Sequence, residues 1–319
     1  MLKAFAGAAF AASILFNTAA HATWPDRPVT VIVPFAAGGL TDVMARLAAE
    51  RLRDKFGQSF IIENQVGAGG ILATANAARA KPDGYTLFFG PVSLMTLSTM
   101  TAKVNYDPDR DFTPVSIVAS TPFVLTVNEA FPAKTLSEFI DEVKKKPGSY
   151  AYASAGAGTT THAASLVVLK AAGLEMIHVP YKGVAPAFND LVAGHVQMGS
   201  ASPVEIKPHL NGGKIRPLGI TSKTRSRQLP DVPTVSETLP TPVVATYNGF
   251  FVPKNTAQEV VDAIAKEVAA AVKTKEFSDK LIQVGLEPGG STPEEMAAII
   301  AADKQNWLAV KGDLTAAMQ

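Results

Sequence analysis

Residues 31–42 read V-I-V-P-F-A-A-G-G-L-T-D, and this stretch decides the fold that we expect. A β-branched run ends at Pro34, small residues fill the next positions, and Thr41 with Asp42 begins an amphipathic helix. A turn with so few side chains leaves backbone N–H groups uncovered at a helix N-terminus, where anions bind readily. The stretch therefore predicts a strand, a glycine turn and a helix that together form an anion site.

A second turn of the same kind spans residues 150–161, which read Y-A-Y-A-S-A-G-A-G-T-T-T. Its hydroxyls and unhindered amides suit carboxylate oxygens, and loops at the carboxyl ends of parallel strands are where open α/β sheets bind ligands. Either turn alone also fits a plain strand-to-helix connection. Together the two turns predict two lobes that hold one anionic ligand between them.

Strand-like and helix-like segments alternate along the chain, which predicts an α/β protein with mostly parallel sheets. The expected strands cover residues 28–33, 60–63, 85–89, 151–153, 176–179, 196–199, 215–221 and 249–252, with two more in 113–127 on either side of Pro122. The expected helices cover residues 41–56, 71–80, 135–146, 159–173, 184–193, 256–273 and 292–310. Residues 221–242 lack periodicity and are interpreted as a surface connection.

The order of these segments predicts that the chain crosses between lobes twice, near residues 122–128 and 246–252. Lobe 1 is then built from residues 23–124 plus 248–319, and lobe 2 from residues 125–247. The first lobe thus uses both ends of the chain and the second uses its middle.

Residues 1–22 have the features of an export signal. Lys3 is their only charge, the apolar run from Ala4 to Phe16 is shorter than the roughly 18 residues of a membrane span, and Ala20-His21-Ala22 fits the small-x-small cleavage rule. The alternative is an uncleaved anchor. The signal predicts cleavage after Ala22 and, in a Gram-negative source, a periplasmic protein.

Charge and cysteine content exclude several functions. Loss of Lys3 leaves 28 of the 29 basic residues, which equals the 28 acidic residues. A neutral chain argues against nucleic acid and anionic membranes as partners. The absence of cysteine suits an oxidising compartment.

Other candidate motifs are weaker. Residues 67–70, G-A-G-G, lack the spacing of a nucleotide loop, and the histidines lack the spacing of metal ligands, so neither a cofactor nor a metal is expected. Ser154 with His162 and an aspartate would form a hydrolase set, but no G-x-S-x-G elbow surrounds Ser154. Phe35 and Tyr247 lie beside an expected loop and an expected crossing, and we predict that they line the pocket.

Ordered motifs along the whole mature chain resemble one family. They are Trp24-Pro-Asp-Arg-Pro28, Val33-Pro-Phe-Ala-Ala-Gly-Gly39, Pro82-Asp-Gly-Tyr-Thr-Leu87, Asp111-Phe-Thr-Pro-Val115, Ala153-Ser-Ala-Gly-Ala-Gly-Thr159 and His178-Val-Pro-Tyr-Lys-Gly183. In these the chain resembles the periplasmic solute-binding proteins of tripartite tricarboxylate transporters, often called Bug proteins.

The resemblance implies a two-lobe type II periplasmic-binding-protein (Venus-flytrap) fold and a non-enzymatic, monomeric receptor that passes a small carboxylate to membrane transporter subunits. A flytrap sensor for a receptor kinase is the alternative. The ligand contacts carried over from the family are Ala37, Gly38, Gly39, Asp42, Ser154, Gly156, Gly158, Thr159 and His162. Family members often carry Trp before the glycine that matches Gly249, whereas this chain has Asn248.

The resemblance leaves the ligand open among tricarboxylates, dicarboxylates, amino acids and aromatic acids. Since neither loop holds an arginine, we expect binding by amides and hydroxyls.

Overall fold

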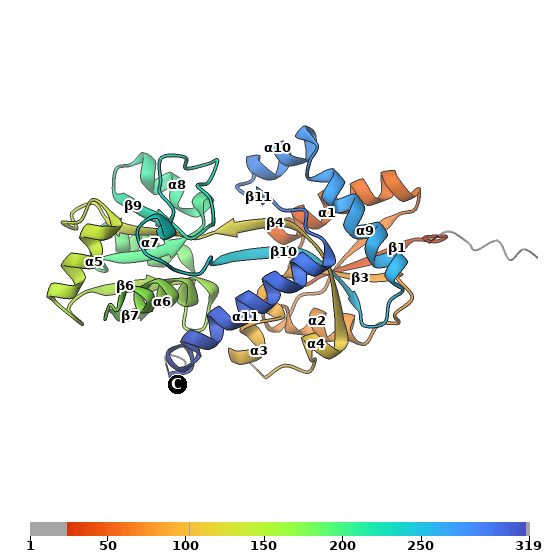
Figure 1. The fold of residues 1–319 in the computed structure, drawn as a ribbon, viewed down its shortest axis with the longest axis horizontal. Coiled ribbons are helices and arrows are strands. Elements are labelled where there is room, and N and C mark those ends of the chain that lie inside the picture. The colour runs from red at the N-terminus through yellow and green to blue at the C-terminus, as the bar shows by residue number, and fades with distance from the viewer. Residues whose placement is uncertain (1–23, 102, 317–319) are drawn as a thin grey trace, which may run out of the picture.

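The computed structural model describes residues 24–101 and 103–316. Two β-sheets lie beside each other with helices on their faces, and extended strands run from one sheet to the other (Figure 1). We name the six-stranded sheet with its helices lobe 1, and the five-stranded sheet with its helices lobe 2. The predicted export signal, residues 1–22, lies outside the described residues. No helix within the described ranges has both the length and the apolar character that a membrane crossing requires.

Lobe 1 is built on a sheet with the strand order β11-β4-β10-β3-β1-β2. Its strands are β1 (Val29–Val33), β2 (Phe60–Asn64), β3 (Thr86–Pro91), β4 (Phe112–Pro122), β10 (Ala245–Pro253) and β11 (Glu287–Pro288). Its helices are α1 (Leu40–Phe56), α2 (Ile71–Ala78), α3 (Leu97–Thr101), α4 (Pro108–Asp111), α9 (Gln258–Ala271), α10 (Lys275–Gln283) and α11 (Pro293–Ala316). β1 pairs in parallel with β2 and β3, and β10 pairs antiparallel with β3 and β4.

Lobe 2 has the strand order β7-β6-β8-β5-β9. Its strands are β5 (Val124–Asn128), β6 (Ala151–Ser154), β7 (Ile177–Pro180), β8 (Met198–Ala201) and β9 (Ile215–Ile220). Its helices are α5 (Leu136–Lys145), α6 (Thr160–Ala172), α7 (Val184–Ala193) and α8 (Pro203–Asn211). β6 pairs in parallel with β7 and β8, while β5 pairs antiparallel with β8 and β9.

The segment that decides the fold behaves as its sequence predicts. Val29, Val31 and Val33 of β1 are fully buried, as expected for a continuous apolar strand inside a parallel sheet. α1 follows after the glycine turn, and Gly57 ends it in the left-handed region at φ 72°. This strand-turn-helix unit places the N-terminus of α1 at the carboxyl edge of the sheet.

A single threonine ties the two crossings together. β4 ends at Pro122 and β5 begins at Val124, while β10 starts at Ala245, which pairs with Pro122. Between them, the Thr221 hydroxyl accepts a hydrogen bond from the Phe123 N–H at 2.9 Å and contacts the carbonyl oxygen of Val244. The Thr221 N–H also donates to the Phe123 carbonyl at 2.9 Å. The crossing strands are therefore joined through one buried side chain.

α11 contacts both lobes. Met296, near its start, lies in a core cluster of lobe 1, whereas Trp307, Val310 and Leu314 pack against α6 of lobe 2 and against the crossings. Figure 1 shows the helix running from lobe 1 toward α6. Because α11 is shared in this way, the division into residues 23–124 plus 248–319 and 125–247 stays a prediction.

The α/β fold with two lobes is confirmed, and the differences from the sequence expectations are local. The crossing strands β5 and β10 add antiparallel pairs to both sheets, because each enters its sheet from the other lobe. α8 was not predicted, since Pro203 and Pro208 resemble helix breakers. α10 was also missed, because only Phe277 and Leu281 of it are buried.

Candidate functional site

A cleft of about 590 Å³ lies between the lobes. Lobe 1 contributes Phe35, Leu40, Thr41, Met44, Ser93 and Val284 to its lining. Lobe 2 contributes Ala155, Thr159, Thr160, Thr161, Val184 and Glu205. The crossing strands line it with Thr121, Thr246 and Asn248. Both predicted glycine turns thus open on the same cavity, one from each lobe.

The buried carboxylate of Asp42 stabilises the conformation of the first turn. The Gly38 N–H donates to Asp42 Oδ2 at 2.8 Å, and Gly38 adopts φ 82°, a left-handed conformation that favours glycine. Arg46 donates to both carboxylate oxygens, at 2.8 and 3.0 Å, and Asn64 donates to Oδ1 at 2.9 Å. Asn64 also donates to the Phe35 carbonyl at 2.9 Å. Asp42 is 1% exposed, so its carboxylate shapes the turn from inside the protein.

These hydrogen-bond donors keep the Asp42 carboxylate ionised. Burial by itself would raise the pKa of Asp42, but the hydrogen bonds from Arg46, Gly38 and Asn64 outweigh it and lower the pKa below its ordinary value. The carboxylate is therefore ionised at neutral pH and fully occupied by its own donors.

The N-terminus of α1 keeps its own amides open. Its N-cap residue, Gly39, has no side chain to cap the helix, and the first intrahelical bond runs from the Val43 N–H to the Gly39 carbonyl at 2.9 Å. Within the described residues, the N–H groups of Leu40, Thr41 and Asp42 have no hydrogen-bond partner. Leu40 and Thr41 line the cleft, so this helix start presents open donors there.

The second turn is held together by its own side chains. The Ala155 N–H donates to Thr161 Oγ1 at 3.0 Å, the Gly156 N–H to Ser154 Oγ at 3.1 Å, and the Gly158 N–H to His162 Nδ1 at 3.1 Å. These bonds leave the N–H groups of Thr160 and Thr161, at the start of α6, without a partner among the described residues. Both residues line the cleft opposite α1.

Two stacked histidines support this second turn. The rings of His162 and His178 lie 3.8 Å apart with an interplanar angle of 3°, and His178 Nε2 lies 2.7 Å from Ser154 Oγ. Burial, together with the neighbouring His178, lowers the pKa of His162 to about 4, and burial lowers the pKa of His178. A neutral His162 can accept the Gly158 N–H at Nδ1, so its protonation state fixes the shape of the turn.

The structure gives the predicted site residues different positions. Phe35 and Thr159 line the cleft, whereas Ala37, Gly38, Gly39, Gly156 and Gly158 lie in the two turns beside it. Asp42, Ser154 and His162 are at most 2% exposed, and their hydrogen bonds stabilise the conformation of the turns. Whether any of them touches a ligand stays a prediction.

Tyr247 was predicted as a pocket wall, and the structure turns it away from the cleft. Successive residues of a strand point to opposite faces, so Thr246 and Asn248 line the cleft while Tyr247 lines a separate hollow with Ser120 and Gly289. If the strand had been expected to begin at Ala245, where β10 does begin, the alternation of its side chains would have indicated Asn248 as the residue that lines the cleft.

The candidate hydrolase residues are also arranged differently from the prediction, because the Ser154 hydroxyl contacts His178 and not His162. No carboxylate among the described residues contacts His178, and Ser154 is 2% exposed. The pair is therefore part of the turn's internal support.

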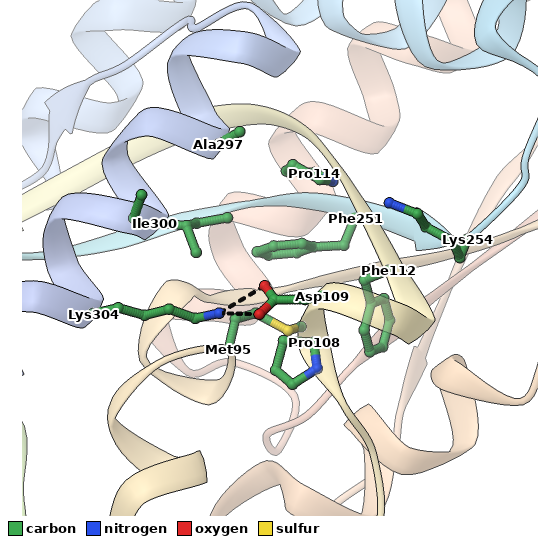
Figure 2. Close-up of a pocket in the computed structure, with 11 residues that line it drawn as sticks. Met95, Pro108, Asp109, Phe112, Pro114, Phe251, Lys254, Ala297, Ile300 and Lys304 are labelled. Atoms are coloured by element: carbon green, nitrogen blue, oxygen red, sulfur yellow. Dashed lines mark hydrogen bonds and ion pairs between the residues drawn. The ribbon is translucent and has the colours of Figure 1, made fainter.

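A second cavity, of about 350 Å³, lies within lobe 1 (Figure 2). Phe112, Phe251 and Ile300 give it an apolar wall, and Lys304 Nζ donates to both carboxylate oxygens of Asp109, at 2.6 and 2.7 Å. Its described lining residues all belong to lobe 1, and the charge of Lys304 is already paired. The cleft between the lobes is therefore the better candidate site.

Comparisons with known proteins place the chain in one family. A family model of the tripartite tricarboxylate transporter family receptor matches residues 44–314. A protein from the tcbD-tcbE intergenic region of Pseudomonas sp. strain P51 is 35% identical over 286 residues, which cover 89% of this chain and 85% of that protein. BugT of Bordetella pertussis is 32% identical over 291 residues, which cover 90% and 89%.

Three solved structures share the fold. An R. palustris protein with adipate is 34% identical, with a TM-score of 0.72 and coverage of 91% of this chain and 98% of that one. MatC from Rhodopseudomonas palustris with bound malate is 33% identical, with a TM-score of 0.69 and coverage of 90% and 100%. A TctC solute-binding protein from Polaromonas without ligand is 29% identical, with a TM-score of 0.81 and coverage of 91% and 98%. The fold is thus the two-lobe flytrap, and the chain belongs to the tripartite tricarboxylate transporter family of periplasmic solute-binding receptors.

Proposed function

We propose that this protein captures a small organic carboxylate in the cleft between its lobes and delivers it to a tripartite tricarboxylate-type membrane transporter. The observation that carries the proposal is the meeting of two helix N-termini in one cavity. The residues that carry the open N–H groups line it, Leu40 and Thr41 from lobe 1 and Thr160 and Thr161 from lobe 2. The two relatives solved with adipate and malate support a carboxylate as the ligand.

The chemistry of a carboxylate fits these donors. Its two oxygens accept about four hydrogen bonds, which matches two amides from each helix. Each helix N-terminus adds a favourable interaction of roughly 0.3–2 kcal/mol with an anion. The ligand then replaces its lost water without a positively charged side chain.

In this proposal the other predicted residues support the amides. Asp42 holds the first turn, Ser154 and His162 hold the second, and Gly38, Gly39, Gly156 and Gly158 keep side chains away from the approaching ligand. Phe35 and Thr159 contact the ligand from the cleft wall, as do the neighbouring Ala37 backbone and Asn248.

Closure of the lobes is the step that buries the ligand. One chain supplies both halves of the cleft, which supports a monomeric protein. We also propose that the signal is cleaved after Ala22 and that the mature protein resides in the periplasm.

Replacing Thr160 with proline tests the amide mechanism. Thr160 is the first residue of α6, where proline is tolerated, and the preceding Thr159 has φ −78° and ψ 165°, which a following proline accepts. The substitution removes one N–H from the cleft. We expect about a tenfold loss of carboxylate affinity in calorimetry, the effect of one charge-assisted hydrogen bond of roughly 1.5 kcal/mol.

Thr160→Ala is the matched control, since it removes the same side chain and keeps the N–H. It should bind within about threefold of the parent protein. Equal affinities in the proline and alanine variants would contradict the amide mechanism.

A further inference from the structure

We infer that the ligand carries a single carboxylate on an apolar body, and that the cleft disfavours a second carboxylate. The inference rests on the proposed function, because it takes the two helix N-termini as the site of the first carboxylate. It depends on three observations: the apolar walls, the charge of the lining, and the state of a third helix N-terminus.

Most of the surface that lines the cleft is hydrocarbon, including side chains at the helix starts. It comes mainly from Phe35, Leu40, Met44, Phe123, Val184 and Val204. Leu40 and Val204, one from each lobe, are each 45% exposed and face the cavity. Apolar side chains in this position gain roughly 25 cal/mol per Å² when a ligand covers them, so they favour a ligand whose body is also apolar.

The charge of the lining opposes a second anion. Among the described residues that line the cleft there is no Lys, Arg or His, and Glu205 is the one side chain with a full charge. A second carboxylate would lose its hydration without finding a cation, and it would share the cavity with the Glu205 carboxylate. A neutral ligand body avoids both the loss of hydration of a charged group and the repulsion from Glu205.

A third helix N-terminus at the cleft carries a carboxylate of its own. α8 starts with Pro203, which has no N–H, and its N-cap residue Ser202 lines the cleft. Glu205 Oε2 accepts the Ser202 N–H at 2.9 Å and the Ser202 hydroxyl at 2.6 Å, and Ser202 Oγ accepts the Glu205 N–H at 3.4 Å. The Glu205 carboxylate thus occupies the Ser202 donors, and an anion that approached the Val204 N–H, which has no partner among the described residues, would meet that negative charge.

The remaining polar groups of the cleft are neutral. Asn248 is 4% exposed, its Oδ1 lies 3.5 Å from Thr41 Oγ1, and its amide nitrogen has no partner among the described residues. Thr121 and Thr246 face each other in the β4–β10 pair. Such groups suit a hydroxyl or carbonyl on the ligand body and give it orientation, without favouring a second charge.

Matched pairs of acids test the inference on the purified mature protein. Hexanoate with adipate, octanoate with suberate, and benzoate with terephthalate each differ in one carboxylate on the same body. Isothermal titration at neutral pH should show that the preferred monoacid binds at least about tenfold more tightly than its diacid partner. Equal or tighter binding of the diacids would overturn the inference and leave the proposed function standing. Failure of every acid to bind would reject both.

A charge-neutral variant identifies the cause. Glu205→Gln keeps an acceptor for Ser202 and removes the charge, so affinity for the diacid should rise about fivefold while affinity for the monoacid stays within about twofold. Glu295→Gln is the matched control: Glu295 closes the start of α11 in the same way, accepting the Thr292 N–H at 2.8 Å, and lies outside the lining of this cleft. An unchanged monoacid-to-diacid ratio in Glu205→Gln, or the same change in Glu295→Gln, would contradict the role of Glu205.

Discussion

Replacing Gly249 with alanine should lower the free energy of unfolding by about 4 kcal/mol. Gly249 lies in β10 between β3 and β4, at an irregularity in the β4 pairing. A Cβ built on it would overlap the Ser116 carbonyl oxygen and lie 3.1 Å from Ile117 Cα. β4 cannot move aside easily, because Ser116 Oγ donates to the Ser291 carbonyl at 2.7 Å and the Ile117 N–H donates to Ser291 Oγ at 3.0 Å.

Urea denaturation followed by circular dichroism measures this change. Gly312→Ala is the contrasting control, because Gly312 lies in α11 with open space around it and alanine there should add about 0.5–1 kcal/mol of stability. A Gly249→Ala variant within about 1 kcal/mol of the parent protein would contradict the packing of β10 against β4. Asn248, which lines the cleft, lies next to Gly249 in β10, so ligand affinity should fall together with stability.

The pH dependence of stability is expected to come from two buried groups with opposite effects. Burial raises the pKa of Asp303 to about 6, although hydrogen bonds from Thr96 and Trp307 partly offset it. Burial lowers the pKa of His162 to about 4. Each difference from the ordinary values of 3.8 and 6.5 corresponds to about 3 kcal/mol.

The signs follow from which state binds the proton first. Between pH 6 and 3.8 the folded protein protonates Asp303 while the unfolded chain does not, so acidification stabilises the fold. Between pH 6.5 and 4 the unfolded chain protonates this histidine while the folded protein keeps it neutral, so acidification destabilises the fold. In the parent protein the two effects largely cancel.

Single substitutions should separate the two effects. Asp303→Asn keeps an oxygen acceptor for Thr96 and Trp307, and its stability should fall by about 2–3 kcal/mol on acidification from pH 6.5 to 4. His162→Asn keeps an acceptor for the Gly158 N–H, and its stability should rise over the same range. The double variant gives the background slope from other groups. Parallel slopes in all three variants, measured by denaturation at each pH, would refute the assignment.

Local patterns were enough to predict most of the fold. The run from Val31 to Asp42 and the loop after Ser154 specify their own strand-turn-helix units, since glycine and small residues leave few other conformations. α8 and α10 escaped prediction because tertiary packing stabilises them against proline or low apolar content. The antiparallel additions to each sheet depend on how the chain returns between lobes, which no local pattern encodes.

The sequence predicted that the two glycine turns would open on one cavity, but it did not predict the hydrogen bonds within the turns. The stack of His162 on His178 and the contact of His178 with Ser154 join strands and helices far apart in sequence, so spacing cannot reveal them. Tyr247 was misplaced because the start of β10 was expected four residues late, at Gly249 instead of Ala245, so its alternation was not traced back to Tyr247. Glu205 was not singled out, because its role depends on α8, a helix that the sequence did not predict.

The placement of α11 has a practical consequence. The chain has two tryptophans: Trp24 packs in lobe 1 against Phe56 and Phe60, and Trp307 is buried where α11 meets α6 and the crossings. An indole at the pivot changes its surroundings whenever the lobes rotate, while an indole inside one lobe does not. After Trp24→Phe we therefore expect the emission spectrum of Trp307 to shift when a ligand closes the lobes, which would provide a fluorescent readout of closure without an added dye.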